Sequence, residues 1–199
     1  MTQSLLRPNR VAIKMFADPQ PQGSPDLEPY IGLFHHFIQA QSLEGLLLDV
    51  ADYAHIPDGP GILLVGHDVD YGVDLGDRRV GLLTVRKRLE DNPLADAARD
   101  TLRRCVSAAR AIADSGVGEL VFSPAEFEVQ LLDRLSAPNS DEGYDQARAE
   151  LDGLLSEVFG SGGCAVARAN AEDPRKPLSL RVSVPGAPDT AELLQGLGG

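Results

Sequence analysis

Side chains that bind metals or move protons are concentrated in residues 49–77. This stretch holds seven aspartates, far more than an even spread along the chain would give, and all four histidines lie between residues 35 and 67. The seven are Asp49, Asp52, Asp58, Asp68, Asp70, Asp74 and Asp77. Carboxylates and imidazoles are common ligands of divalent cations and common general acids and bases. The sequence therefore places a candidate site in this stretch.

Two strands predicted here would bring several of these groups together. Asp49 follows three leucines in a strand that looks buried, where a carboxylate is costly unless it is paired or bound to a cation. Asp52 and His55 come next, and His67 and Asp68 end the neighbouring strand. If the two strands are adjacent, these groups could converge at one end of the sheet. The predicted metal ligands are Asp49, Asp52, His55, His67, Asp68 and Asp70.

The residue types allow two kinds of chemistry at such a site. Mixed histidine and carboxylate ligands would suit Mn, Fe or Zn, whereas carboxylates alone would suit Mg or Ca. A histidine beside an aspartate could also act as an oriented general base. The catalytic candidates are Asp49, His67 and Asp68.

Structural roles compete with both kinds of chemistry. Four of the aspartates fall at predicted turns, where the side chain bonds to the backbone: Asp52, Asp58, Asp74 and Asp77. His67 shares a predicted strand face with Val65 and Val69, so a position in the core is an alternative to a ligand.

Hydrophobic periodicity defines the elements of the first half. Alternation predicts a strand over residues 10–17, and apolar spacings of three and four predict a helix over residues 27–41. The continuous apolar run from Leu46 predicts a strand buried on both faces. The strand that begins at Ile62 is expected to continue through Tyr71 and then to form a hairpin.

The second half contains one ambiguous segment, residues 123–135. The capping box Ser123–Glu126 favours a helix, whereas the strict alternation from Glu126 to Leu131 favours a strand, and we interpret it as a strand. The other predicted elements are helices over residues 92–115 and 141–159, strands over 163–169 and 178–184, and a short C-terminal helix.

The order of elements repeats, which predicts the fold. Two β-α-β-β units are offset by about 116 residues. The matched positions are Val11 and Phe127, Tyr30 and Tyr144, Leu46 and Cys164, and Ile62 and Leu178. We expect a single α+β domain over residues 1–199, with pseudo-repeat halves at about 10–90 and 118–199. Its sheet would be mixed but largely antiparallel, with helices packed on one side, although chance similarity of two ordinary units is an alternative.

Composition excludes several classes of protein. The chain has 30 acidic and 18 basic residues, and its net charge of −12 opposes binding to nucleic acids and to anionic membranes. No apolar run approaches the ~18 residues that span a bilayer, and the N-terminus lacks the apolar core of a signal peptide. Cys105 and Cys164 lie in apolar contexts and are expected to be buried thiols. These features predict a cytoplasmic protein.

Some segments of the chain are familiar: Leu47–Tyr53 with Gly59–Tyr71, and Asp133–Asn139. They resemble a family of bacterial cytosolic proteins that has no assigned function, and the similarity would span most of the chain. The resemblance implies a bacterial cytosolic protein and favours the strand after Glu126. It implies no mechanism.

These observations predict a non-catalytic binding or structural protein that forms a homo-oligomer, most simply a homodimer. The alternative is an enzyme that acts on a small molecule through the Asp/His cluster at residues 49–74, by metal-dependent or acid–base chemistry. A divalent metal ion is the one cofactor that the residues suggest, and a small-molecule ligand is compatible with either function.

Overall fold

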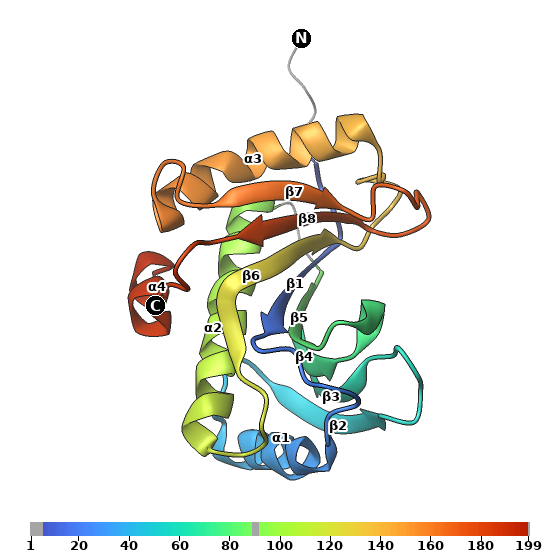
Figure 1. The fold of residues 1–199 in the computed structure, drawn as a ribbon, viewed down its shortest axis with the longest axis vertical. Helices are drawn as coiled ribbons and strands as arrows, with labels where there is room; N and C mark the ends of the chain where they lie inside the picture. Colours follow the sequence, from blue (N-terminus) through green and yellow to red (C-terminus); the bar gives the residue numbers. More distant parts are fainter. Residues whose placement is uncertain (1–5, 89–91, 199) are drawn as a thin grey trace.

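The computed structural model describes residues 6–88 and 92–198, whose strands form one antiparallel sheet (Figure 1). The strands are β1 (Arg10–Ala17), β2 (Leu47–Tyr53), β3 (Gly61–Gly66), β4 (Val69–Asp74), β5 (Gly81–Lys87), β6 (Phe122–Leu131), β7 (Ala165–Ala169) and β8 (Leu178–Ser183). The helices are α1 (Glu28–Ala40), α2 (Leu94–Ser115), α3 (Asp141–Phe159) and α4 (Thr190–Gly196), with a short 3-10 turn η1 (Gly76–Arg78). The strand order is β2-β3-β4-β5-β1-β6-β8-β7. The α+β class is confirmed, and the ladders among the described residues are all antiparallel.

The two halves of the chain meet at β1 and β6. These central strands pair with Val11 opposite Leu131. Each leads into a helix, α1 or α3, and the chain then returns from one edge of the sheet as a meander, β2 to β5 in the first half and β7 to β8 in the second. Because the first meander has an additional hairpin, β8 lies beside β6 whereas β3 is separated from β1. The predicted match of Ile62 to Leu178 therefore holds for element order but not for position in the sheet.

One face of the sheet is covered by helices, and the other carries none of the described helices. Val11, Ile13 and Met15 of β1 point into the main core, where α2 packs across β1, β5 and β6. Lys14 and Phe16, which alternate with these residues along β1, lie on the opposite, helix-free face and are also buried. Figure 1 shows α2 along one side of the sheet, with α1 and α3 near its two ends. None of the described helices is both long and apolar enough to cross a membrane.

The ambiguous segment after Ser123 is a strand, as its alternation favoured. β6 pairs with β1 on one side and with β8 on the other. Phe127 and Val129 point into the core, and the intervening Glu128 lies on the helix-free face. Pairing on both sides satisfies the backbone groups of this segment, and it therefore outweighs the local capping-box signal.

Two predictions for the first half are wrong. The strand that begins at Ile62 is interrupted, because β3 ends at Gly66 and β4 starts at Val69. The strand after Leu46 is not buried on both faces, because β2 is an edge strand, and Leu48 is 52% exposed. An apolar run indicates an inner strand only if other strands flank it, and local sequence does not reveal the flanking strands.

The two cysteines differ in burial. Cys105 is buried in α2, as expected, and burial raises the pKa of its thiol to about 12. Cys164 is half-buried, and both thiols are free. Cys105 is therefore protonated at neutral pH and packs as an apolar side chain.

Candidate functional site

The predicted site residues lie in separate places. β2 and β3 are adjacent, but they are antiparallel, with Asp52 opposite Ile62. The end of β2 therefore meets the start of β3, and Asp52 and His55 lie at the opposite end of this strand pair from His67 and Asp68. The expected convergence at one end of the sheet is wrong, because it required both strands to end on the same side.

Asp49 and Asp52 are exposed on β2 and accept hydrogen bonds from backbone amides. The Val50 amide donates to Asp49 Oδ1 at 2.8 Å, and the Ala54 amide donates to Asp52 Oδ1 at 2.8 Å. His55 follows in the loop and lines a surface hollow of about 610 Å³. The desolvation cost that suggested a cation at Asp49 does not arise, because its strand is at the surface.

His67 and Asp68 are brought together in the turn between β3 and β4. His67 Nδ1 lies 2.8 Å from Asp68 Oδ1, and the two side chains are 54% and 66% exposed. The His67 amide donates to the Leu46 carbonyl at 2.8 Å, which ties the turn to the start of β2. A core position for His67 is thus wrong, and the imidazole is held by a carboxylate at the surface.

Asp70 and Asp74 lie on the inner strand β4 and pair with lysines of the neighbouring strand β5 and of β1, the next strand beyond it. Asp70 Oδ1 accepts from Lys87 Nζ at 2.7 Å and from the Gly66 amide at 3.0 Å. Asp74 is buried and accepts from Lys14 Nζ. In the described ranges, no three His, Cys, Asp or Glu side chains are arranged to hold a metal ion. The metal prediction thus depends on residue type alone.

Lys14 and Asp74 form a buried ion pair in the middle of the helix-free face. Lys14 is 3% exposed, and its ammonium also donates to the Gly76 carbonyl of η1 at 2.6 Å. Burial raises the pKa of Asp74, and the charge and hydrogen bond of Lys14 oppose that shift. A lysine within the apolar strand β1 was the sequence signal for this pair, and it was not recognised.

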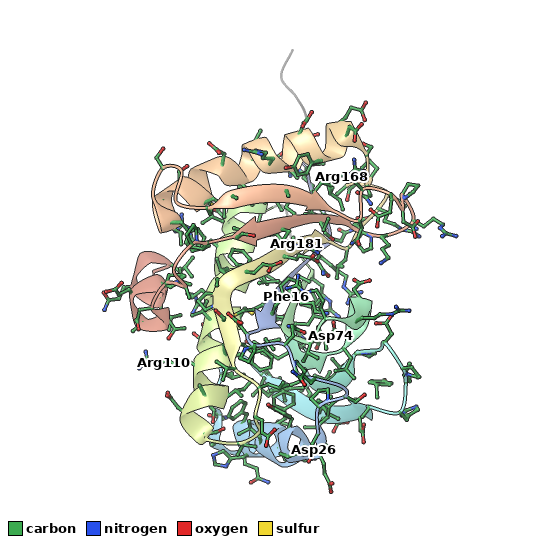
Figure 2. All side chains as sticks on the ribbon, viewed as in Figure 1. Phe16, Asp26, Asp74, Arg110, Arg168 and Arg181 are labelled. Atoms are coloured by element: carbon green, nitrogen blue, oxygen red, sulfur yellow. The ribbon has the colours of Figure 1, made fainter. Side chains whose placement is uncertain are left out.

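Arginines from the neighbouring elements extend this charged network. Arg79 donates to the two carboxylate oxygens of Glu126 at 2.7 and 3.1 Å, and its guanidinium carbon lies 3.6 Å from the centre of the Phe16 ring. Arg181 donates to Glu128 Oε1 at 2.8 Å. The Arg79 hydrogen bond lowers the pKa of Glu126. Figure 2 shows Phe16 and Arg181 together on the side of the sheet away from α2.

The network is electrically balanced. It consists of the cations Lys14, Arg79 and Arg181 and the anions Asp74, Glu126 and Glu128. An adjoining hollow lined by Phe16 and Arg79 has a volume of about 240 Å³. Typical ligand pockets are larger, at about 300–1,000 Å³. Because each charged group already has an opposite partner, the network is suited to holding this face of the sheet together.

The β7 edge of the sheet is closed by side chains. The Tyr144 hydroxyl and the Arg148 guanidinium, both from α3, donate to the Val166 carbonyl at 3.3 and 3.4 Å. Arg168 of β7 donates in turn to Asn139 Oδ1 at 3.0 Å, in the loop before α3. The two bonds to the Val166 carbonyl occupy a backbone group that another strand would need for pairing.

The opposite edge, which we call the β2 edge and define as residues 46–56, is open. β2 is the last strand on this side, and among residues 6–88 and 92–198 it pairs with β3 alone, with α1 packed near it. Large apolar side chains are exposed along it: Leu46 (61%), Leu48 (52%), Tyr53 (39%) and Ile56 (40%). The side chains that hydrogen-bond to its backbone belong to its own Asp49 and Asp52.

The β2 edge also lies in the most acidic part of the chain. Residues 15–77 contain eleven acidic residues and no lysine or arginine. Bases from elsewhere in the chain pair with four of them, Glu44, Asp70, Asp74 and Asp77. Within the described residues, no such base pairs with Asp49 or Asp52. The β2 edge is therefore open to a further strand and apolar, and its own charged side chains are negative, while Arg103 and Arg104 of α2 are held by Glu44 just before it.

No family model matches the chain, and no curated protein matches it in sequence.

Proposed function

We propose that this chain is a non-catalytic binding protein that takes an extended strand of a partner at the β2 edge. The contrast between the two edges of the sheet supports the proposal. Tyr144 and Arg148 close the β7 edge, whereas the β2 edge offers unpaired backbone beside exposed Leu46 and Leu48. An unpaired strand edge is a template for a further strand, and exposed apolar groups beside it supply affinity through burial.

The remainder of the molecule is consistent with a binding role. The charged groups of the helix-free face are paired with one another, so they need no charged substrate to balance them. The predicted homodimer is one form of this proposal, in which the added strand is β2 of a second copy.

Peptides of the same length as β2, seven residues, test the proposal. We suggest a panel of Thr/Val peptides that carry Lys, Ser or Glu at two positions, with binding followed by fluorescence anisotropy and self-association by sedimentation. The Val50→Pro variant removes an amide at the β2 edge, and Val166→Pro is the matched change at the closed edge. Proline is tolerated on edge strands whose N–H faces away from the ladder, and circular dichroism checks that both variants fold.

The expected result is binding or self-association that Val50→Pro abolishes and Val166→Pro leaves unchanged. A wild-type protein that binds no peptide of the panel and stays monomeric would overturn the proposal.

The alternative is a metal-dependent or acid–base enzyme, and the observation that favours it is the His67–Asp68 hydrogen bond of 2.8 Å. A carboxylate that orients an imidazole is a common arrangement for a general base. Elemental analysis of the purified protein, together with thermal shifts in Mg, Mn, Zn and EDTA, tests the metal. This second function would be favoured if the purified protein contains a metal whose removal lowers the melting temperature. The His67→Ala variant should then also lack the metal.

A further inference from the structure

We infer that the partner strand of the β2 edge carries two basic residues three positions apart, with apolar residues between and around them. This inference rests on the proposed function and adds the chemistry of the partner. Its basis is the position of the two carboxylates on the edge strand, combined with the absence of lysine and arginine from the surrounding sequence.

Asp49 and Asp52 lie on opposite faces of the sheet. Asp52 is opposite Ile62, which points into the core. Asp49 is opposite Val65, which lies three residues after Ile62 on β3 and therefore points to the other face. Side chains alternate between faces along a strand, so each face of the β2 edge carries one carboxylate. An added strand that places a cation directly opposite each of them carries its two basic residues three positions apart as well.

A partner strand could replace the present hydrogen bond between the Val50 amide and the Asp49 carboxylate. The Val50 amide now donates to Asp49 Oδ1 at 2.8 Å. A partner strand would offer a carbonyl to this amide, and the carboxylate would then be free to accept from a lysine or arginine of the same strand. One hydrogen bond within the chain is thereby replaced by two across the interface.

Charge disfavours a second copy of this chain as the occupant. Self-pairing of β2 would bring Asp49 and Asp52 of both copies into one ladder, and residues 41–60 contain no lysine or arginine to separate them. Like charges in neighbouring cross-strand positions are destabilising, and the net charge of −12 on each copy adds long-range repulsion. A basic strand from another protein meets the opposite sign.

The experiment compares three seven-residue Thr/Val peptides with the full chain. The first has two lysines three positions apart, the second has two lysines two positions apart, and the third has glutamates in place of the lysines of the first. We expect the first to bind about tenfold more tightly than the other two, and to weaken as salt is raised. In Asp49→Asn/Asp52→Asn this preference should disappear. As a measurement that needs no variant, the first peptide should slow amide hydrogen exchange at residues 47–53 and not at 165–169.

The outcomes separate this inference from the proposed function. Equal binding of the three peptides, abolished by Val50→Pro, would retain the strand-binding function and overturn the basic partner. Self-association that the lysine peptides do not compete with would identify a second copy as the occupant, and would also overturn the inference. If exchange at residues 47–53 responds to no peptide and to no increase in protein concentration, both proposals fail.

Discussion

Aspartates from one short stretch of the chain have two different roles, which depend on their position across the sheet. Asp74 lies on the inner strand β4, is buried, and pairs with Lys14. Asp49 lies on the edge strand β2, is exposed, and bonds to a backbone amide. An inner strand has other strands on both sides that can supply a counter-charge, whereas the outer side of an edge strand meets solvent or a partner. Clustering in the sequence therefore did not indicate a shared site.

The largest effect that tests this comparison is expected from Asp74→Asn. The change leaves the Lys14 ammonium buried without an anion, and breaking a buried pair in this way costs about 3–5 kcal/mol. Urea unfolding should show a loss of this size, and Lys14→Met introduced together with Asp74→Asn should recover part of it. If Asp74→Asn proves no more costly than Asp49→Asn, the inner and edge positions do not differ as we describe.

A smaller loss is expected from Asp70→Asn. Asp70 and Lys87 are partly buried, with side chains 21% and 24% exposed, so the lost charge-assisted hydrogen bonds should cost about 1–2 kcal/mol. Since Asp70 also accepts from the Gly66 amide, hydrogen exchange at Gly66 should accelerate. Unchanged exchange there would show that Asp70 does not hold the β3–β4 turn.

The pH dependence of stability should differ between two carboxyls of the helix-free face. The pKa of Glu126 is lowered in the folded protein, so its contribution is present above the unfolded pKa and is lost as pH falls through the folded value. The pKa of Asp74 is raised by burial, so its contribution has the opposite sign and decreases as pH rises. Urea unfolding between about pH 3 and 6 should therefore show a weaker loss of stability on acidification in Glu126→Gln than in wild type. A steeper loss in that variant would contradict the assignment.

The smallest effect is expected from Asp49→Asn/Asp52→Asn. Both carboxylates are exposed and unpaired by any base of the described chain, so unfolding free energy should change by no more than about 0.5 kcal/mol. Thermal unfolding measures this directly. A loss as large as that of Asp70→Asn would mean that these carboxylates stabilise the fold and are not reserved for a partner.

Local patterns in the sequence predicted most of the elements. The helix over residues 141–159 has its predicted bounds, because Ser140 caps the Gly143 amide at 3.1 Å and Gly160 follows the last turn. The alternation after Glu126 likewise identified β6. These signals come from residues within one element, where propensity and capping act.

The site depended on distant contacts, and the sequence predicted it less well. Lys14 meets Asp74 across 60 positions of sequence, and only the strand order brings them together. The apolar run from Leu46 has the composition of an inner strand, yet β2 has a neighbour on one side alone. The direction of β3 relative to β2 decided that His55 and His67 lie apart. The lysine within apolar β1 indicated that a counter-charge was needed, but no local signal identifies its partner, the edge position of β2 or the direction of β3.

The closed β7 edge has a consequence for the size of any assembly. A sheet with two free edges can join copies head to tail without limit, which leads to filaments. Here the hydroxyl of Tyr144 and the guanidinium of Arg148 occupy the Val166 carbonyl at one end of the sheet, so growth can proceed from the other end alone. Each chain can then be extended once, and the product is a discrete complex that stops growing when the β2 edge is filled.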